Sequence, residues 1–146
     1  MVAGSGHVVS LGGWRIQARP VAAAVALFGT PRLEERDSFD CLARWNSIGL
    51  VVELINDGTG GACRGPGAHF GRAILTGSRW RTDRGLAVGN SVSRVQSLYP
   101  GATLHGTVWW LFPRDAALGI SYSDAPLFAR TAAGRVTALG VEAGHD

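Results

Sequence analysis

The fold is decided by two stretches, Phe39-Asp-Cys-Leu-Ala-Arg-Trp45 and Gly49-Leu-Val-Val-Glu-Leu-Ile55, which the short bend Asn46-Ser47 separates. Both stretches are rich in apolar residues and are bounded by turn-forming residues, as β-strands are. They predict an antiparallel hairpin. We expect a charged turn at 34–37 before this hairpin and a glycine-rich loop at 57–67 after it.

The chain has 146 residues, of which 46% are hydrophobic and 17% are charged. This length and composition predict a single domain, 1–146, with its own core. No apolar run approaches the ~20 residues that a bilayer span needs, so we expect no membrane span. The chain has 14 basic residues, all of them arginine, and 11 acidic residues, which gives a net charge of +3. This excess is too small to predict a nucleic-acid partner.

Two short amphipathic helices are predicted, at 20–28 and at 91–99, because apolar residues recur there at helical spacing. Strand-like segments follow each helix, and 42–44 with 49–55 resembles 128–130 with 134–141. The remaining strand candidates are 71–76, 79–82, 105–112, 118–123, 126–131 and 135–142.

This order predicts an α+β fold, an antiparallel β-sheet with two short helices on one face. It also suggests two helix-plus-meander repeats, at approximately 12–76 and 80–142. Chance similarity is the alternative, since helical periodicity alone makes any two amphipathic helices look alike.

The chain has two cysteines, Cys41 and Cys63, and neither belongs to a CxxC motif or lies beside a histidine. Metal binding is therefore not expected. In an oxidising compartment the two would pair, whereas two unrelated buried thiols are the alternative.

A family resemblance is carried by Cys41-x-x-x-Trp45-x-x-x-Gly49-Leu50, by Cys63, and by Trp80-Arg-Thr-Asp-Arg-Gly-Leu-Ala-Val-Gly-Asn-Ser91 with Leu98-Tyr-Pro-Gly-Ala102. In these motifs the chain resembles uncharacterised exported proteins and lipoproteins of actinobacteria, over about residues 12–142. The resemblance implies a secreted or cell-envelope protein with a Cys41–Cys63 disulfide. It implies a signal peptide outside this sequence, and no catalytic residue.

The arrangement of two helix-plus-meander units is also similar in outline to the tandem repeats of the beta-lactamase inhibitory proteins and of small outer-membrane assembly lipoproteins. This second resemblance concerns architecture alone. The chain departs from the inhibitor pattern because its second half has no cysteine pair. That departure argues against inhibitor activity.

Enzyme motifs are largely missing from the sequence. Without lysine there is no Walker A loop, no Schiff-base lysine and no Ser-Lys dyad, and neither GxSxG nor HExxH occurs, so we expect no cofactor. One enzymatic alternative is a small hydrolase or transferase that uses the 63–72 loop, with Cys63 as nucleophile and His69 as base. Oxidation of Cys63 would exclude this pair and leave His69 as a surface histidine.

Two charged features have both a functional and a structural interpretation. Glu53 lies in an apolar strand, where it either is buried beside an arginine or points outward, and strand alternation favours the second. The arginines around Trp80 form a basic region that could bind phosphates or stack on sugars, although Asp83 interrupts it and a solvated turn is the simpler interpretation. The arginines concerned are Arg64, Arg72, Arg79, Arg81 and Arg84.

The run Val108-Trp109-Trp110-Leu111-Phe112 places its two tryptophans on opposite faces of a strand. Because two helices cover one face only, the other indole is either an exposed anchor or is covered by the long 56–80 excursion or by a second copy in a dimer. Our leading hypothesis is a non-enzymatic domain that binds a protein or an envelope component through Trp109 or Trp110, with Trp80 and Arg81 as further binding residues. A purely structural envelope protein, with both indoles in the core, is the other alternative.

Overall fold

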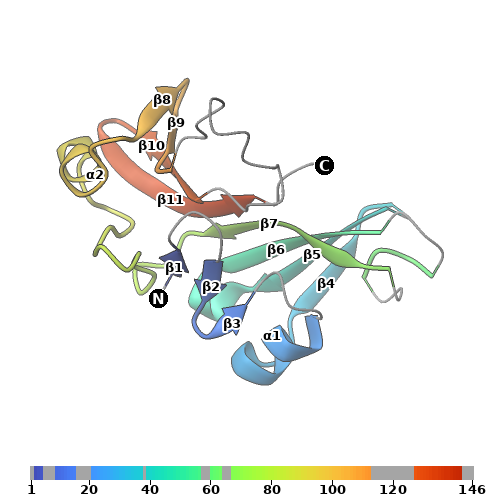
Figure 1. The fold of residues 1–146 in the computed structure, drawn as a ribbon. Coiled ribbons are helices and arrows are strands. Elements are labelled where there is room, and N and C mark those ends of the chain that lie inside the picture. The colour runs from blue at the N-terminus through green and yellow to red at the C-terminus, as the bar shows by residue number, and fades with distance from the viewer. Residues whose placement is uncertain are drawn as a thin grey trace.

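The computed structural model describes residues 2–4, 9–15, 21–37, 39–56, 60–63, 67–112 and 127–142. These residues form an α+β fold with one antiparallel sheet of eight strands, a small sheet of three strands and two short α-helices (Figure 1). The small sheet consists of β1 (Val2–Gly4), β2 (Val9–Leu11) and β3 (Trp14–Arg15).

The first half of the large sheet is a four-strand meander that follows α1 (Val21–Phe28). Its strands are β4 (Arg32–Glu35), β5 (Asp40–Trp45), β6 (Leu50–Ile55) and β7 (His69–Leu75). A single 3-10 turn, Asn46–Ile48, joins β5 to β6, and Trp45 pairs with Leu50 beside it. The hairpin expected at this place is therefore confirmed.

The second half is a four-strand meander that follows α2 (Val92–Leu98). Its strands are β8 (Thr103–His105), β9 (Val108–Trp110), β10 (Leu127–Ala132) and β11 (Arg135–Glu142). The two meanders meet where β7 pairs with β11, and Leu75 lies opposite Leu139 in this pair. The strand order across the whole sheet is β4-β5-β6-β7-β11-β10-β9-β8.

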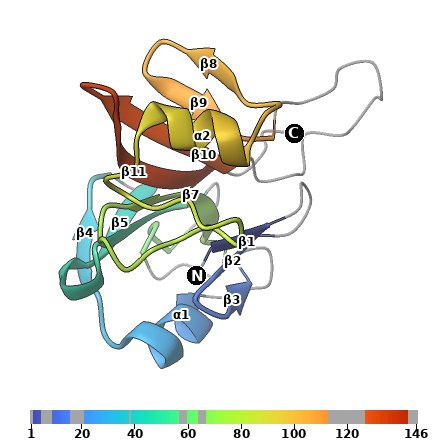
Figure 2. The same ribbon diagram turned by 90° about the vertical axis from the view of Figure 1, so that its left-hand side faces the viewer.

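Local sequence explains how α2 begins and how α1 ends. Ser91 caps α2, since its hydroxyl accepts a hydrogen bond of 3.3 Å from the main-chain N–H of Arg94. Gly29 ends α1 with a left-handed φ of 87°, a conformation that glycine adopts without strain. Figure 2 shows α1 beside the small sheet and α2 near β9 and β10.

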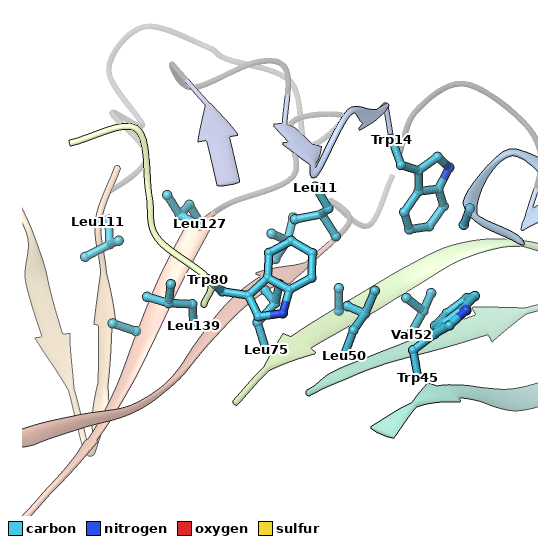
Figure 3. Packing of buried hydrophobic residues seen from close by; sticks show 14 of the residues in the cluster. Leu11, Trp14, Trp45, Leu50, Val52, Leu75, Trp80, Leu111, Leu127 and Leu139 are labelled. Carbon is cyan, nitrogen blue, oxygen red and sulfur yellow. The ribbon is translucent and has the colours of Figure 1, made fainter. Parts of the chain in front are cut away.

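One hydrophobic cluster fills the space above one side of the large sheet, which we call the helical face. The register places Trp45, Leu50, Leu75, Leu139 and Trp109 on this side. Both helices and the small sheet bury side chains in the same cluster. Figure 3 labels several of its larger members, among them Leu11 and Trp14 of the small sheet. The strands β5, β6 and β7 therefore turn alternate residues toward the core and away from it.

Three strand predictions need correction. The expected charged turn at 34–37 overlaps the exposed edge strand β4, whose mostly charged residues hide its alternation. The expected single strand at 105–112 is a hairpin, β8 and β9, because Gly106 turns the chain with a φ of 64°. The candidate at 79–82 contributes one isolated bridge, from Arg81 to Ala87. The candidate at 118–123 lies outside the described residues.

The resemblance between the two halves is explained only in part by this topology. The helices α1 and α2 occupy equivalent places, each before a meander of four strands. Segments 42–44 and 128–130 do not, since they lie in the second strand of the first meander and the third strand of the second. Short alternating strands resemble one another whatever their position.

Candidate functional site

The side of the large sheet that faces away from both helices is the outer face. The row of residues that crosses it from β5 to β9 begins with one arginine, becomes aliphatic and ends in two aromatic rings. Its members, in order of register, are Arg44, Val51, Ile74, Gly140, Phe128 and Trp110. The aromatic end of this row is the candidate site.

The two neighbouring tryptophans lie on opposite faces. Trp109 is 8% exposed and belongs to the hydrophobic cluster on the helical face. Trp110 is half-buried and lies on the outer face, where its ring centroid is 5.2 Å from that of Phe128, at an angle of 59°. The alternation expected from the sequence thus separates one core indole from one partly accessible indole.

A glycine beneath Phe128 fixes the position of this aromatic pair. A Cβ added to Gly140, the residue opposite Phe128 in β11, would overlap the phenyl ring. Phe128 consequently lies flat against the β11 backbone and is only 2% exposed. The guanidinium of Arg130 lies 5.8 Å from the centroid of the same ring. Trp110 therefore rests on a rigid support, with a cationic group nearby.

Charged side chains occupy the part of the outer face beyond the aliphatic residues. Glu53 lies opposite Arg72 in the register, and Arg72 donates from Nη2 to Glu142 at 3.5 Å. Near the sheet edge Arg44 donates from Nε to Glu34 at 3.2 Å. Glu53 is thus half-buried on the outer face, with an arginine of the neighbouring strand opposite it. This is the outward position that strand alternation favours.

Trp80, expected to contribute to binding, lies in the core instead. Its ring is 3% exposed and packs edge-on against Phe28, with 6.0 Å between centroids. Its Nε1 donates a hydrogen bond to the carbonyl of Ile48. Its neighbours in the sequence, Ser78, Arg79, Arg81 and Thr82, are polar, so no local pattern indicates this core role.

The arginines around Trp80 do not share one environment. Arg81 and Arg79 are exposed, whereas Arg72 is half-buried on the outer face. Arg84 donates from Nη1 to the carbonyl of Leu98 at 3.0 Å, and its guanidinium lies 4.7 Å from the centroid of the Tyr99 ring. Arg64 lies outside the described residues.

The cysteines form a disulfide, which excludes Cys63 as the nucleophile of a Cys63/His69 pair. His69 is exposed, and its Nδ1 lies 3.0 Å from the carbonyl oxygen of Gly67. His105 is also exposed. His7 and His145 lie outside the described residues. The enzymatic alternative thereby loses its nucleophile.

A separate cavity of about 410 Å³ lies next to the disulfide, and Leu33, Glu35, Gly60 and Cys63 line it. The loop beside it is held by Asn56, a fully buried residue whose Nδ2 donates to the carbonyl of Gly61 at 2.7 Å.

Within the described ranges, no group of three or more His, Cys, Asp or Glu side chains is placed so that it could hold a metal ion. In the same ranges no helix has the length and apolar character to cross a membrane.

Comparison with known proteins gives little further information. No family model matches the chain, and no curated protein matches it. Among solved structures, it is similar to the crystal structure of an extracellular protein containing a SCP domain from Bacillus anthracis, with 11% sequence identity and a TM-score of 0.46. The similarity covers 84% of this chain and 42% of that one, so this chain spans less than half the length of the compared structure.

Proposed function

We propose that this chain is a non-enzymatic binding domain that engages a protein of the cell envelope or of the extracellular medium through its outer face. Trp110 is the anchor of this proposal. One observation carries it: a half-buried indole lies on the face opposite the helices and rests on a nearly fully buried phenyl ring. Aromatic residues held rigidly beside polar groups are typical of binding hot spots.

The charged pairs on the same face favour a protein partner. Arg72 with Glu142 and Arg44 with Glu34 place both signs of charge beside the aliphatic residues Val51 and Ile74. An apolar centre with a polar rim of mixed charge is the usual composition of a protein interface. A surface for a polyanion would carry an excess of one sign instead.

A secreted or envelope-attached location is part of the proposal. The disulfide between Cys41 and Cys63 supports it, because disulfides persist mainly in oxidising compartments. We further propose membership of the actinobacterial exported family that the motifs resemble, and an origin of the fold from two repeated units. The equivalent places of α1 and α2 before their meanders support the second point.

The test is affinity capture from an envelope extract of the source organism, using immobilised wild-type protein and two variants. Trp110→Ala removes the anchor, and Leu27→Ala removes an apolar side chain that is 52% exposed on α1. We expect wild type and Leu27→Ala to retain the same saturable partner, and Trp110→Ala to lose at least tenfold in affinity.

Two results would reject this function. If Trp110→Ala keeps its fold by circular dichroism and captures the partner as well as wild type does, Trp110 is not the anchor. Loss of the fold in Trp110→Ala would instead indicate that this indole belongs to the core, as in a purely structural protein. The variant Arg130→Ala tests the same surface without deleting a ring. A folded Arg130→Ala protein with weakened capture would support binding through the outer face, and unchanged capture would count against it.

A further inference from the structure

The two cysteines of the Cys41–Cys63 disulfide differ in how deeply they are buried. Cys41 is fully buried in β5, whereas Cys63 is half-buried and lines the cavity of about 410 Å³. A thiolate breaks a disulfide by attacking one sulfur and expelling the other, so access decides which sulfur reacts. In this protein access favours attack at Cys63, with Cys41 as the leaving group.

A carboxylate stands at the same cavity. Glu35 pairs directly with Cys41 across β4 and β5, and its Oε1 lies 2.6 Å from the position that a Cβ on Gly61 would occupy. Arg36, the next residue along the chain, forms an ion pair of 3.4 Å with Asp40. Among the described residues that line the cavity, Glu35 is the charged one and brings a negative charge, and Leu33 provides an apolar wall.

We propose that Cys63 is a site of S-thiolation, selective for small thiols that carry a cationic group. The thiolate attacks Sγ of Cys63, the bond between the two Sγ atoms breaks, and the electron pair leaves on Sγ of Cys41. Cys41 then takes a proton from water. The products are a mixed disulfide on Cys63 and a free thiol at Cys41, with no other oxidant or reductant needed. The inference is independent of the function proposed for the outer face.

The selectivity follows from the charge at the cavity. The carboxylate of Glu35 repels an anionic thiol and attracts the ammonium group of an aminothiol, and charges that meet in one partly hydrated cavity interact strongly enough to change rates. The freed Cys41 thiol stays beside the mixed disulfide on Cys63 and can attack it in turn, which restores the original disulfide and releases the small thiol. The adduct must therefore be trapped by acid before it reverses.

The experiment treats the native protein at low ionic strength with three thiols of similar size: 2-aminoethanethiol, 2-mercaptoethanol and mercaptoacetate. Adducts are quenched with acid and located by peptide mass spectrometry, and rates are expressed per thiolate. We expect the adduct on Cys63 and a rate about three to ten times higher for the aminothiol than for mercaptoacetate. In about 1 M salt the preference should fall toward unity, because salt screens charges over this distance.

Two variants identify the charge responsible. Glu35→Gln should abolish the preference between the thiols. Glu34→Gln makes the same charge change on the adjacent residue, which pairs with Arg44 on the outer face, and should keep the preference. Adducts on Cys41, equal rates in the wild type, or an unchanged preference in Glu35→Gln would each overturn the proposal. So would a rate that does not depend on thiol concentration, because it would mean that the protein unfolds before the disulfide reacts.

Discussion

Trp80 donates a hydrogen bond from its indole Nε1 to the main-chain carbonyl of Ile48, and the donor and acceptor atoms are 2.5 Å apart. Ile48 lies in the turn between β5 and β6, while Trp80 belongs to the segment that leaves β7. Close to this bond a Cβ on Gly49 would overlap the backbone of Gly77, and a Cβ on Gly77 would overlap the carbonyl of Ile48. The bond therefore fastens the connection between the two meanders to the first hairpin.

Replacing Trp80 with phenylalanine should destabilise the fold by about 1–3 kcal/mol, because it leaves the Ile48 carbonyl without this donor and reduces packing against Phe28. Urea unfolding followed by circular dichroism measures the change. Trp110→Phe is the matched control, and the half-buried position of this ring predicts a loss below about 1 kcal/mol. Equal losses in the two variants would contradict the role assigned to the hydrogen bond.

The two adjacent tryptophans should differ in their contribution to stability. Trp109→Ala removes a ring from the core and should cost about 3–5 kcal/mol, whereas Trp110→Ala removes a half-buried ring and should cost clearly less. Both values come from denaturant unfolding under identical conditions. If Trp110→Ala cost as much as Trp109→Ala, the outer face would have to be treated as core.

Gly140 should tolerate no side chain while Phe128 is present. Gly140→Ala is expected to cost about 1–3 kcal/mol, because the new methyl group displaces the Phe128 ring. A double-mutant cycle tests the cause. In a Phe128→Ala background the same glycine substitution should cost little, and additive costs in the double mutant would show that the strain arises elsewhere.

Tyr99 should make the stability fall at alkaline pH. Burial raises the pKa of Tyr99 above its ordinary value of 10.0, and the smaller effect of the nearby Thr82 side chain opposes this shift. The unfolded chain therefore releases this proton at a lower pH than the folded chain, so stability declines as the pH rises past about 10 until the folded pKa is reached.

Tyr99→Phe should remove that part of the decline, which unfolding experiments between pH 8 and pH 11 would measure. Near neutral pH the same variant should change stability by less than about 1 kcal/mol, because within the described residues the buried hydroxyl makes no hydrogen bond that would be lost. An alkaline decline of the same size in wild type and variant would assign the effect to another group.

Local patterns predicted much of this fold. The hairpin of β5 and β6 follows from two apolar stretches around a short bend, and the opposite directions of Trp109 and Trp110 follow from strand alternation alone. The edge strand β4 escaped prediction because Leu33 is its single apolar residue and is itself 38% exposed. Where no face is buried, the sequence carries no alternation to detect.

The candidate site depended on information that one strand does not contain. Trp110 was predictable as a residue opposite to Trp109, but its support by Phe128 requires the pairing of β9 with β10. The need for glycine at position 140 arises only once β11 pairs with β10. Trp80 misled the interpretation, since arginines on both sides suggested a surface for an indole that is buried.

The pairing of β7 with β11 has a kinetic consequence. Every other pair in the large sheet joins strands that follow one another along the chain, so each of these pairs can close a short loop early in folding. The pair of β7 and β11, in which Leu75 lies opposite Leu139, closes a much longer loop, so its formation costs more chain entropy than that of any other pair in this sheet. We therefore expect the β7–β11 pair to form last. Amides of β7 that face β11 should gain hydrogen-exchange protection later than those that face β6.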